Sequence, residues 1–339
     1  METLLQVSLI VCLMLLLFSG YPVALVLIGT SAIFSVVAIG LDLMSFKMLS
    51  LFPLRMIGMF SENLIYPAVA PLIFMGVALE KSGIARDLFF GISHLLKRMP
   101  GGLLVAVLFL GVLLAPAAGL IGASVAMLSL AALPTLLSQG YKPSIASSSV
   151  AAAGTAGIII PPGIMLFFLA DLLELPIAAT FTSVLYPVAL LLLFYAVFFV
   201  ATALLGRDQV HKLDLKTSEK FTSNSLLVLS KLLAPVLLIG TVLGSIVSGW
   251  ATPTQAGSIG AAGAFILMVA TRSFSWSRMH DVVFETGMIT AMVFFVIIGA
   301  NTFSFVLRIL GGDELLPNLL SWLQLGDWGS LLFILGIIF

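Results

Sequence analysis

The chain has 339 residues, of which 61% are hydrophobic and only 9% are charged. Soluble domains average about 45–50% apolar and about 25% charged residues, so this composition excludes a water-soluble globular protein. The 15 lysines and arginines balance the 15 aspartates and glutamates, and no basic run favours nucleic acid as a partner. The single cysteine, Cys12, excludes a disulfide framework within the chain and a thiolate metal site.

Apolar stretches of about 20 residues predict membrane-spanning helices. Short polar segments divide the chain into such stretches at residues 4–19, 23–41, 64–80, 102–138, 143–170, 176–205, 225–250, 254–271, 286–310 and from near 329 onward. This pattern predicts an all-α polytopic membrane protein. Because no Lys or Arg precedes Lys47, the first stretch lacks the basic start of a signal peptide, and we expect it to be a retained span.

Two segments differ from simple spans. Residues 84–98 alternate apolar and charged faces at helical spacing, which predicts an amphipathic helix in the membrane interface. Residues 102–138 are too long for one crossing and are interrupted halfway by Pro116, Gly119 and Gly122. This interruption predicts a re-entrant hairpin that enters and leaves the membrane on the same side.

The basic residues predict an orientation. With a hairpin at 102–138, the positive-inside rule places three of the 15 lysines and arginines outside, namely Lys47, Arg55 and Arg308. The other twelve lie on the cytoplasmic side: Lys81, Arg86, Lys97, Arg98, Lys142, Arg207, Lys212, Lys216, Lys220, Lys231, Arg272 and Arg278. The N-terminus is therefore expected in the periplasm and loop 206–224 in the cytoplasm.

The order of the elements suggests an inverted repeat. A span, an amphipathic segment and a hairpin in the first half are followed later by a span, the polar stretch 311–327 and the start of another apolar element. Inverted repeats with broken helices near the bilayer midplane are typical of secondary transporters. The expected regions are scaffold spans at 1–70, a first repeat at 71–175 (hairpin 102–138, broken helix 143–170), connecting spans at 176–285 and an incomplete second repeat at 286–339.

The segment 153–163 places two prolines inside an apolar crossing. Because proline has no N–H, Pro161 and Pro162 leave the carbonyls of Gly157 and Ile158 without their helical donors. Unpaired carbonyls at membrane depth need a partner, and a small cation is one possibility. An ordinary Gly/Pro kink is the alternative, since both residues are common in membrane helices.

The interruption of the hairpin predicts a second group of polar atoms near the bilayer midplane. A hairpin tip with Ser124 and loose backbone groups would face the same zone as the broken helix. The candidate residues of this hairpin tip and substrate zone are Ala118, Gly119, Gly122, Ser124, Gly154 and Thr155. Packing of small residues between helices is the alternative, and it also accounts for the serines at 144 and 147–149.

An enzymatic function has little support in the sequence. The Gly122-Ala-Ser124 run resembles the nucleophile of intramembrane serine proteases, but no histidine lies at membrane depth to act as its base. The sequence also lacks the G-x-x-x-x-G-K-[ST] phosphate loop. We therefore expect transport that is driven by an ion gradient.

At these motifs the sequence resembles the large membrane subunit (DctM type) of the tripartite ATP-independent periplasmic (TRAP) transporters. The likeness runs from near residue 20 to Phe339, and it depends on the order and spacing of motifs that are individually weak. These motifs are Pro71–Gly76 with Glu80–Gly83, Pro100–Gly102, Gly122–Ser124 with Ala132–Pro134, Gly140–Tyr141, Ala153–Pro162 and Ala251–Thr254.

The resemblance implies an elevator-type carrier of the ion-transporter-superfamily kind in the bacterial inner membrane. It implies a sodium gradient as the driving force, with sodium as the coupling ion and no further cofactor or transition metal. It also implies organic acid substrates, a periplasmic substrate-binding protein and a small four-helix membrane subunit. Main-chain oxygens of Gly157, Ile159 and Pro162, with the hairpin tip, would hold the first sodium ion.

Two positions depart from the family pattern. The Ser-Gly-Ser tip of the family reads Ala118-Gly119-Leu120 here, and the acid after Ala-Thr-Pro-Thr is replaced by Gln255. Ala118 removes a hydroxyl from the expected cation site. The second repeat is also expected to be truncated, because a second hairpin tip and a second broken helix would follow Gly336. A stand-alone ion-coupled anion transporter and a non-transporting scaffold or remnant therefore remain alternatives.

Overall fold

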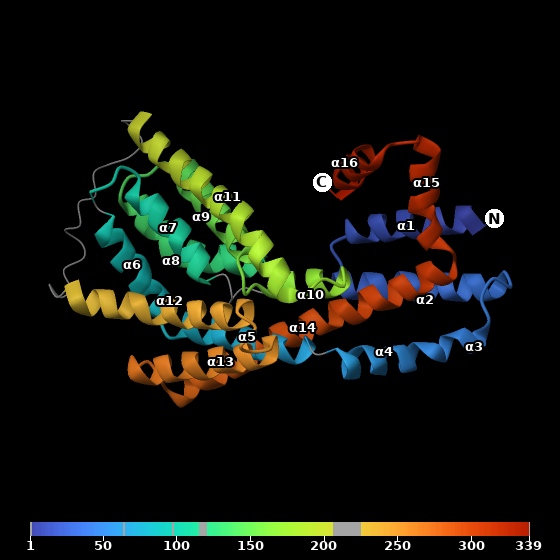
Figure 1. Ribbon diagram of the computed structural model, residues 1–339, viewed down its shortest axis with the longest axis horizontal. Coiled ribbons are helices and arrows are strands. Elements are labelled where there is room, and N and C mark those ends of the chain that lie inside the picture. The colour runs from blue at the N-terminus through green and yellow to red at the C-terminus, as the bar shows by residue number, and fades with distance from the viewer. Residues whose placement is uncertain (1, 64, 97, 115–120, 206–224, 339) are drawn as a thin grey trace. The chain divides into compact units, whose positions relative to one another are not determined.

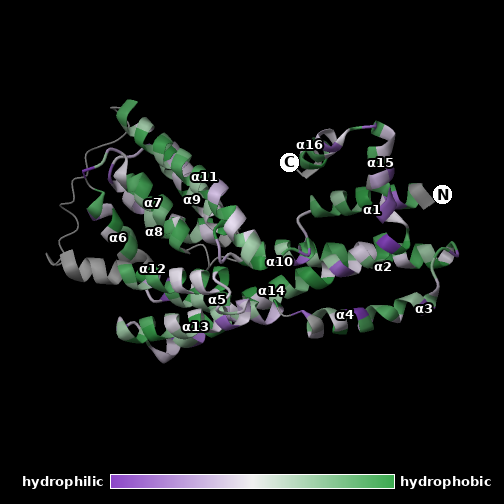
Figure 2. Ribbon diagram, in the orientation of Figure 1, coloured by the Kyte–Doolittle hydropathy of each residue, from purple (hydrophilic) through white to green (hydrophobic). Residues whose placement is uncertain are grey.

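The computed structural model describes residues 2–63, 65–96, 98–114, 121–205 and 225–338. In these ranges every regular element is a helix (Figure 1). Four of the described helices are long and apolar enough to cross a membrane, and the number rises to six if two bent pairs each count as one span. Hydrophobic residues dominate the long helices (Figure 2). The prediction of an all-α polytopic membrane protein is confirmed.

The helices form two compact units. The terminal unit consists of residues 1–63 and 291–339, and the central unit consists of residues 64–290. The terminal unit contains α1 (Glu2–Leu17), α2 (Val23–Gly40), α3 (Phe46–Leu49), α4 (Leu51–Glu62), the later part of α14 (Trp276–Ile309), η3 (Gly312–Glu314), α15 (Leu315–Leu323) and α16 (Asp327–Ile338).

The central unit contains the remaining helices and the first part of α14. These are α5 (Tyr66–Lys81), α6 (Ile84–Leu95), α7 (Gly102–Leu114), α8 (Ile121–Ser138), α9 (Pro143–Ile159), α10 (Ile164–Leu172), α11 (Ile177–Leu205), α12 (Ser225–Val247) and α13 (Pro253–Ala270). The segment 102–138, predicted as a re-entrant hairpin, contains the helices α7 and α8. Its tip, 115–120, and the predicted cytoplasmic loop 206–224 lie outside the described residues.

Close packing of α5 on α13 organises one side of the central unit. A Cβ atom at Gly257 of α13 would lie 3.2 Å from Leu72 Cγ and 3.3 Å from the Ala68 carbonyl oxygen of α5, so the two backbones approach closely. Small residues allow such approaches between membrane helices. Gln255 has a structural role here, because it forms a reciprocal capping box with Thr252 at the start of α13.

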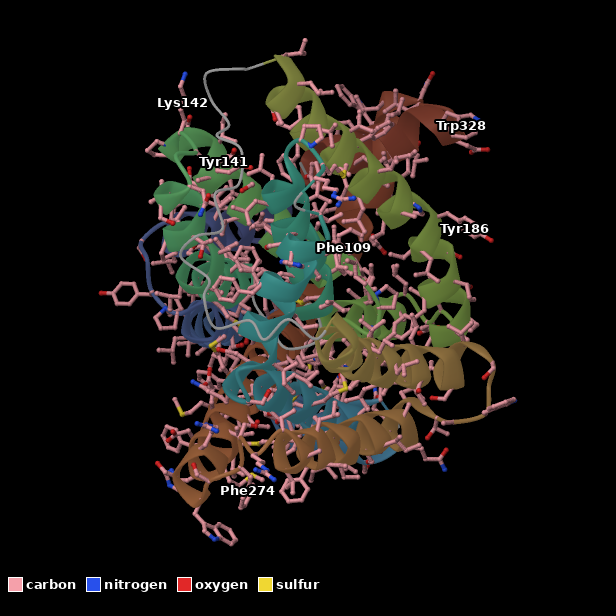
Figure 3. All side chains as sticks on the ribbon, turned by 90° about the vertical axis from the view of Figure 1, so that its left-hand side faces the viewer. Phe109, Tyr141, Lys142, Tyr186, Phe274 and Trp328 are labelled. Atoms are coloured by element: carbon pink, nitrogen blue, oxygen red, sulfur yellow. The ribbon has the colours of Figure 1, made fainter. Side chains whose placement is uncertain are left out.

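The hairpin helices form the other side of the central unit. Helix α9 packs on both α7 and α8, and α11 packs on α7 and α9 (Figure 1). A short turn joins α8 to α9, with Tyr141 buried and Lys142 exposed; Figure 3 shows both side chains at this end. Burial raises the pKa of Tyr141 to about 12.

The terminal unit has a core of its own. Leu9 of α1, Phe34 of α2 and Phe305 of α14 are among the buried residues of this core. The side-chain amide of Gln6 donates a hydrogen bond to the carbonyl of Leu310, just beyond the end of α14. Since the last carbonyls of a helix lack helical donors, Gln6 serves as a cap supplied by a distant part of the sequence.

One local arrangement occurs twice in the chain. Helix α5 is followed by Gly83 (φ 76°) and the short amphipathic helix α6, and α14 is followed by Gly311 (φ 75°) and then by the amphipathic helix α15. A positive φ is easily adopted only by glycine, so both sharp turns depend on the residue type.

The helices also extend beyond the predicted spans. Helix α14 begins ten residues before the predicted start at 286, and α4 and α15 occupy segments expected to be polar connections. Hydropathy misses the first turns of α14 because their polar side chains are exposed or paired; Glu285 forms an ion pair with Lys81 of α5, with 2.8 Å between Nζ and Oε2.

Candidate functional site

The broken helix α9–α10 is the centre of the candidate site. Helix α9 begins with Pro143, which suits a first-turn position, and ends at Ile159. Helix α10 begins at Ile164, and the two axes differ by 46°. The residues between them include Pro161 and Pro162, which are joined by a cis peptide bond. The predicted break therefore lies at the double proline.

Hydrogen bonds at the break differ partly from the expectation. The amide of Ile160 donates to the carbonyl of Gly157 at 3.2 Å, and the amide of Gly163 donates to the carbonyl of Ile160 at 3.0 Å. The Gly157 carbonyl is therefore not unpaired, because a donor three residues ahead replaces the missing Pro161 N–H. No described residue donates a hydrogen bond to the carbonyls of Ile158 or Ile159, so these two oxygens are available.

Gly163 allows the chain to bend at the break. A Cβ atom at this position would lie 2.5 Å from the carbonyl oxygen of Ile158 and 3.0 Å from that of Ile160. Any other residue would displace one of these carbonyls. The absence of a side chain at Gly163 therefore preserves the cluster of main-chain oxygens beside the double proline.

Close helix crossings hold α9 in place beside the hairpin. A Cβ atom at Gly154 would lie 2.6 Å from Val125 Cγ2 and 3.1 Å from Val125 Cα of α8. A Cβ atom at Gly111 of α7 would overlap the carbonyl of Ala153. Gly154, predicted as part of a substrate zone, thus contacts α8 directly, and Gly111 and Val125 are packing residues that the sequence did not single out.

The other predicted residues of the hairpin tip and substrate zone differ in their surroundings. Ala118 and Gly119 lie outside the described residues, and Gly122 lies in the first turn of α8. Thr155 is exposed, and its hydroxyl donates to Ala151 of its own helix at 2.9 Å. Ser124 is 1% exposed, and its hydroxyl has no hydrogen-bond partner among the described residues.

The cation-site residues differ in burial. Gly157 and Pro162 are buried, whereas the side chain of Ile159 is 43% exposed. Among the described residues, no group of three His, Cys, Asp or Glu side chains could hold a metal ion.

A polar contact that the sequence did not predict lies at the far end of α10. Tyr66, at the start of α5, hydrogen-bonds to Asp171, one residue before the end of α10. This contact attaches the end of the broken helix to α5.

Comparison with known proteins identifies the family. The model of the "Tripartite ATP-independent periplasmic transporter, DctM component" family matches residues 10–339. The chain belongs to the DctM family. The family is one of transporter permeases, and its members are multi-pass proteins of the inner membrane, in agreement with the helices described above.

Several characterised members of the DctM family are similar to this chain. The C4-dicarboxylate TRAP transporter large permease protein DctM of Pseudomonas aeruginosa is 28% identical over 81% of this chain and 63% of its own length. The isethionate TRAP transporter permease protein DctMQ of Oleidesulfovibrio alaskensis is 26% identical over 92% and 47%. The ectoine TRAP transporter large permease protein TeaC of Halomonas elongata is 26% identical over 86% and 66%. The chain thus spans about half to two thirds of these relatives.

Proposed function

We propose that this chain is the large permease subunit of a tripartite secondary transporter that takes up organic acids. A sodium gradient would drive uptake. The carbonyls beside Pro161 and Pro162 carry the proposal, because unpaired backbone oxygens in broken membrane helices are typical cation ligands of secondary transporters. Membership of the DctM family supports the same function.

The proposed sodium site uses main-chain oxygens of Gly157, Ile159 and Pro162 together with the hairpin tip. The Ile159 carbonyl lacks a donor in the described structure, whereas the Gly157 carbonyl already accepts one from Ile160. A carbonyl oxygen has two lone pairs, so Gly157 can bind a cation without losing this hydrogen bond. Ala118 contributes no hydroxyl to such a site.

The proposed substrate is a small organic acid. The names of the relatives mention a C4-dicarboxylate, isethionate and ectoine, so family membership leaves the individual compound open. The N-terminal ends of α8 and α10 could favour an anion, since helix N-termini carry partial positive charge. Gly122, Gly154 and Thr155 belong to this substrate zone in the proposal.

The proposed assembly contains a small four-helix membrane subunit and a periplasmic binding protein that delivers the substrate. We further propose an inverted repeat in which α5 and α6 correspond to α14 and α15. The recurrent glycine turns at Gly83 and Gly311 support this correspondence. With the N-terminus in the periplasm, the turn at Lys142 and the loop 206–224 face the cytoplasm.

Substitution of Gly157 tests the sodium site. Gly157→Leu should abolish sodium-dependent uptake by the complete transport system while leaving the amount of protein in the membrane unchanged. Gly240→Leu is a matched control, because a Cβ atom at Gly240 in α12 would have no neighbour within 4 Å. Sodium dependence that persists in Gly157→Leu would contradict the proposal. Ala118→Ser should increase the apparent sodium affinity.

A further inference from the structure

Exposed tryptophans flank α13 in the central unit. Trp250 precedes this helix and is 88% exposed, and Trp276 follows it, at the start of α14, and is 81% exposed. Tryptophan is highly buried on average in soluble proteins. Its exposure in a membrane protein is typical of the membrane–water interface, where the apolar ring faces lipid and the N–H group faces the headgroups.

Helix α13 has the length of a membrane crossing between these two tryptophans. Its 18 residues rise about 27 Å, close to the hydrocarbon thickness of about 30 Å, and the helix is apolar enough for a span. Ile259, Ile266 and Val269 of this helix are 48–63% exposed. Helix α13 therefore presents an apolar surface to lipid tails, and the turn between α13 and α14 lies at one membrane interface.

The two ends of α13 differ in charge. No aspartate, glutamate, lysine or arginine occurs between residues 232 and 271, so the Trp250 end is neutral. The Trp276 end carries Arg272 and Arg278 with no acid between them. The turn between α13 and α14 therefore combines positive charge with a position in the membrane interface.

The acids that follow in α14 have cationic partners of their own. Glu285 forms its ion pair with Lys81 of α5. Asp281 interacts with the same lysine, and its Oδ1 atom lies 4.0 Å from Nδ1 of His280. These partners reduce the competition of the acids for the two arginines of the turn.

Aromatic rings of the turn form a row that leads from the span to the arginines. The ring of Phe274 contacts Phe265 of α13, with 5.8 Å between ring centroids, and Trp276, with 5.7 Å. The guanidinium of Arg278 donates a hydrogen bond to the carbonyl of Ser273, which holds it beside this row. Because a guanidinium has five N–H donors, Arg278 keeps donors for a ligand.

This arrangement matches the parts of a phospholipid. Arginine binds phosphate oxygens through two N–H groups at once, and Arg272 is exposed in the same turn. Basic sites beside membrane helices favour anionic lipids on the cytoplasmic side. A lipid with a net negative charge fits two guanidinium groups better than a zwitterionic lipid, whose ammonium group brings a further cation to the turn.

We propose that the α13–α14 turn binds an anionic phospholipid of the phosphatidylglycerol type. Arg272 and Arg278 hold its phosphate, Trp276 lies at the depth of its headgroup, and its acyl chains lie along the exposed face of α13. In the proposed orientation this turn faces the cytoplasmic leaflet. The inference depends on the membrane location of the chain and not on the proposed sodium coupling or substrate.

Fluorescence quenching tests the two ends of α13 separately. Two forms of the full chain retain one tryptophan each, Trp276 or Trp250, with the other three replaced by phenylalanine, and both are placed in phosphatidylcholine vesicles. Brominated phosphatidylglycerol or brominated phosphatidylcholine is the quencher. Trp276 should report about twentyfold stronger association of phosphatidylglycerol, since each interfacial arginine favours an anionic lipid about fivefold. Trp250 should report no preference, because its end of α13 is uncharged.

Arginine variants of the Trp276 form test the phosphate ligands. Arg272→Gln should lower the preference about fivefold, and Arg272→Gln combined with Arg278→Gln should abolish it. Because Arg272 is exposed, its single variant remains informative if loss of the Arg278 hydrogen bond disturbs the turn. Lys142→Gln is a matched control, since it removes an exposed basic residue at another turn of the central unit, and it should leave the preference unchanged.

Three results would overturn the inference. Equal quenching of Trp276 by the two brominated lipids would show that the turn does not select an anionic lipid. An equal decrease in Lys142→Gln and Arg272→Gln would assign the preference to the overall charge of the chain. Loss of the preference on addition of inorganic phosphate, at the concentration of the brominated lipid, would assign the turn to a soluble anion. None of these results affects the proposed transport function, which the Gly157 variant tests.

Discussion

The segment α9–α10 and helix α11 respond differently to proline. Both are long apolar segments with proline inside the crossing, yet α9 ends at Ile159 before Pro161, whereas α11 continues through Pro187 for all of its 29 residues. One reason is local, because two consecutive prolines remove two donors and the missing side chain at Gly163 leaves room for the bend. The second reason is the environment of each segment.

Burial separates the two segments clearly. Helix α9 buries eight residues, most of them small, whereas α11 buries Phe181, Val188 and Phe199. Tyr186 of α11 is 81% exposed, and its side chain projects away from the ribbon (Figure 3). Irregular backbone at membrane depth is tolerated where protein or a water-filled cavity surrounds it, and not where it faces lipid. The break in α9 is therefore stabilised by its neighbours α7 and α8.

The largest effect should come from placing the double proline in the exposed helix. Leu191→Pro combined with Leu192→Pro removes two hydrogen-bond donors in the middle of α11, at about 3 kcal/mol or more for each proline, and most residues around them are exposed. We expect no accumulation of folded protein, measured by fluorescence-detected size-exclusion chromatography. The single variant Leu191→Ala should accumulate normally. Normal accumulation of the double-proline variant would show that burial does not determine where a break is tolerated.

A smaller effect is expected from loosening the packing around the break. In Gly111→Ala the new methyl group overlaps the carbonyl of Ala153, and overpacking costs about 1–3 kcal/mol. The melting temperature should fall, and α7 should separate from α9. Gly240→Ala, in open space on α12, should be neutral or slightly stabilising because alanine favours helix. Equal melting temperatures for both variants would contradict the close approach of α7 and α9.

Much of the fold could be predicted because hydropathy and helix-breaking residues act locally. The apolar stretches became helices at nearly the expected positions, and the double proline marked the break. Helices α4 and α15 were missed, since hydropathy does not detect short helices with mixed composition. The first turns of α14 were missed because their polar side chains lower the hydropathy; one of these is Glu285, which forms an ion pair with Lys81 of α5.

The candidate site was less predictable because it depends on contacts between helices. The sequence indicated that Gly157 loses a donor, but only the geometry of the break shows that Ile160 replaces it and that the Ile159 carbonyl has none. The sequence predicted Gly154 as a site residue. Its contact with Val125 could not be predicted, because the sequence does not give the register in which α8 packs on α9. The close packing of Gly111 on α9 could have been inferred only from the presence of glycines in both α7 and α9.

Restoring the donors at the break should affect coupling more than stability. Pro161→Ala combined with Pro162→Ala supplies two amide groups to the carbonyls of Gly157 and Ile158, each hydrogen bond contributing about 1 kcal/mol. The chain should remain folded, while the apparent sodium affinity of uptake falls, since a continuous helix would point the carbonyls of Gly157 and Ile159 along its axis and away from a shared cation. Uptake at graded sodium concentrations, with protein amount measured in the same membranes, checks this result. Unchanged sodium dependence would indicate that the break has a purely structural role.

The smallest effect, of opposite sign, is expected at the proline that does not break its helix. In α11, Pro187 leaves the carbonyl of Ser183 without its helical donor, and Pro187→Ala restores that hydrogen bond in a helix that is already continuous. The melting temperature should rise slightly, by a free energy of about 1 kcal/mol or less, and the sodium dependence of uptake should not change because α11 contributes no ligand to the proposed site. Thermal unfolding and uptake at graded sodium concentrations test the two expectations separately. A loss of sodium dependence in Pro187→Ala would show that α11 also takes part in coupling, and the contrast between the two proline-containing segments would then be one of degree.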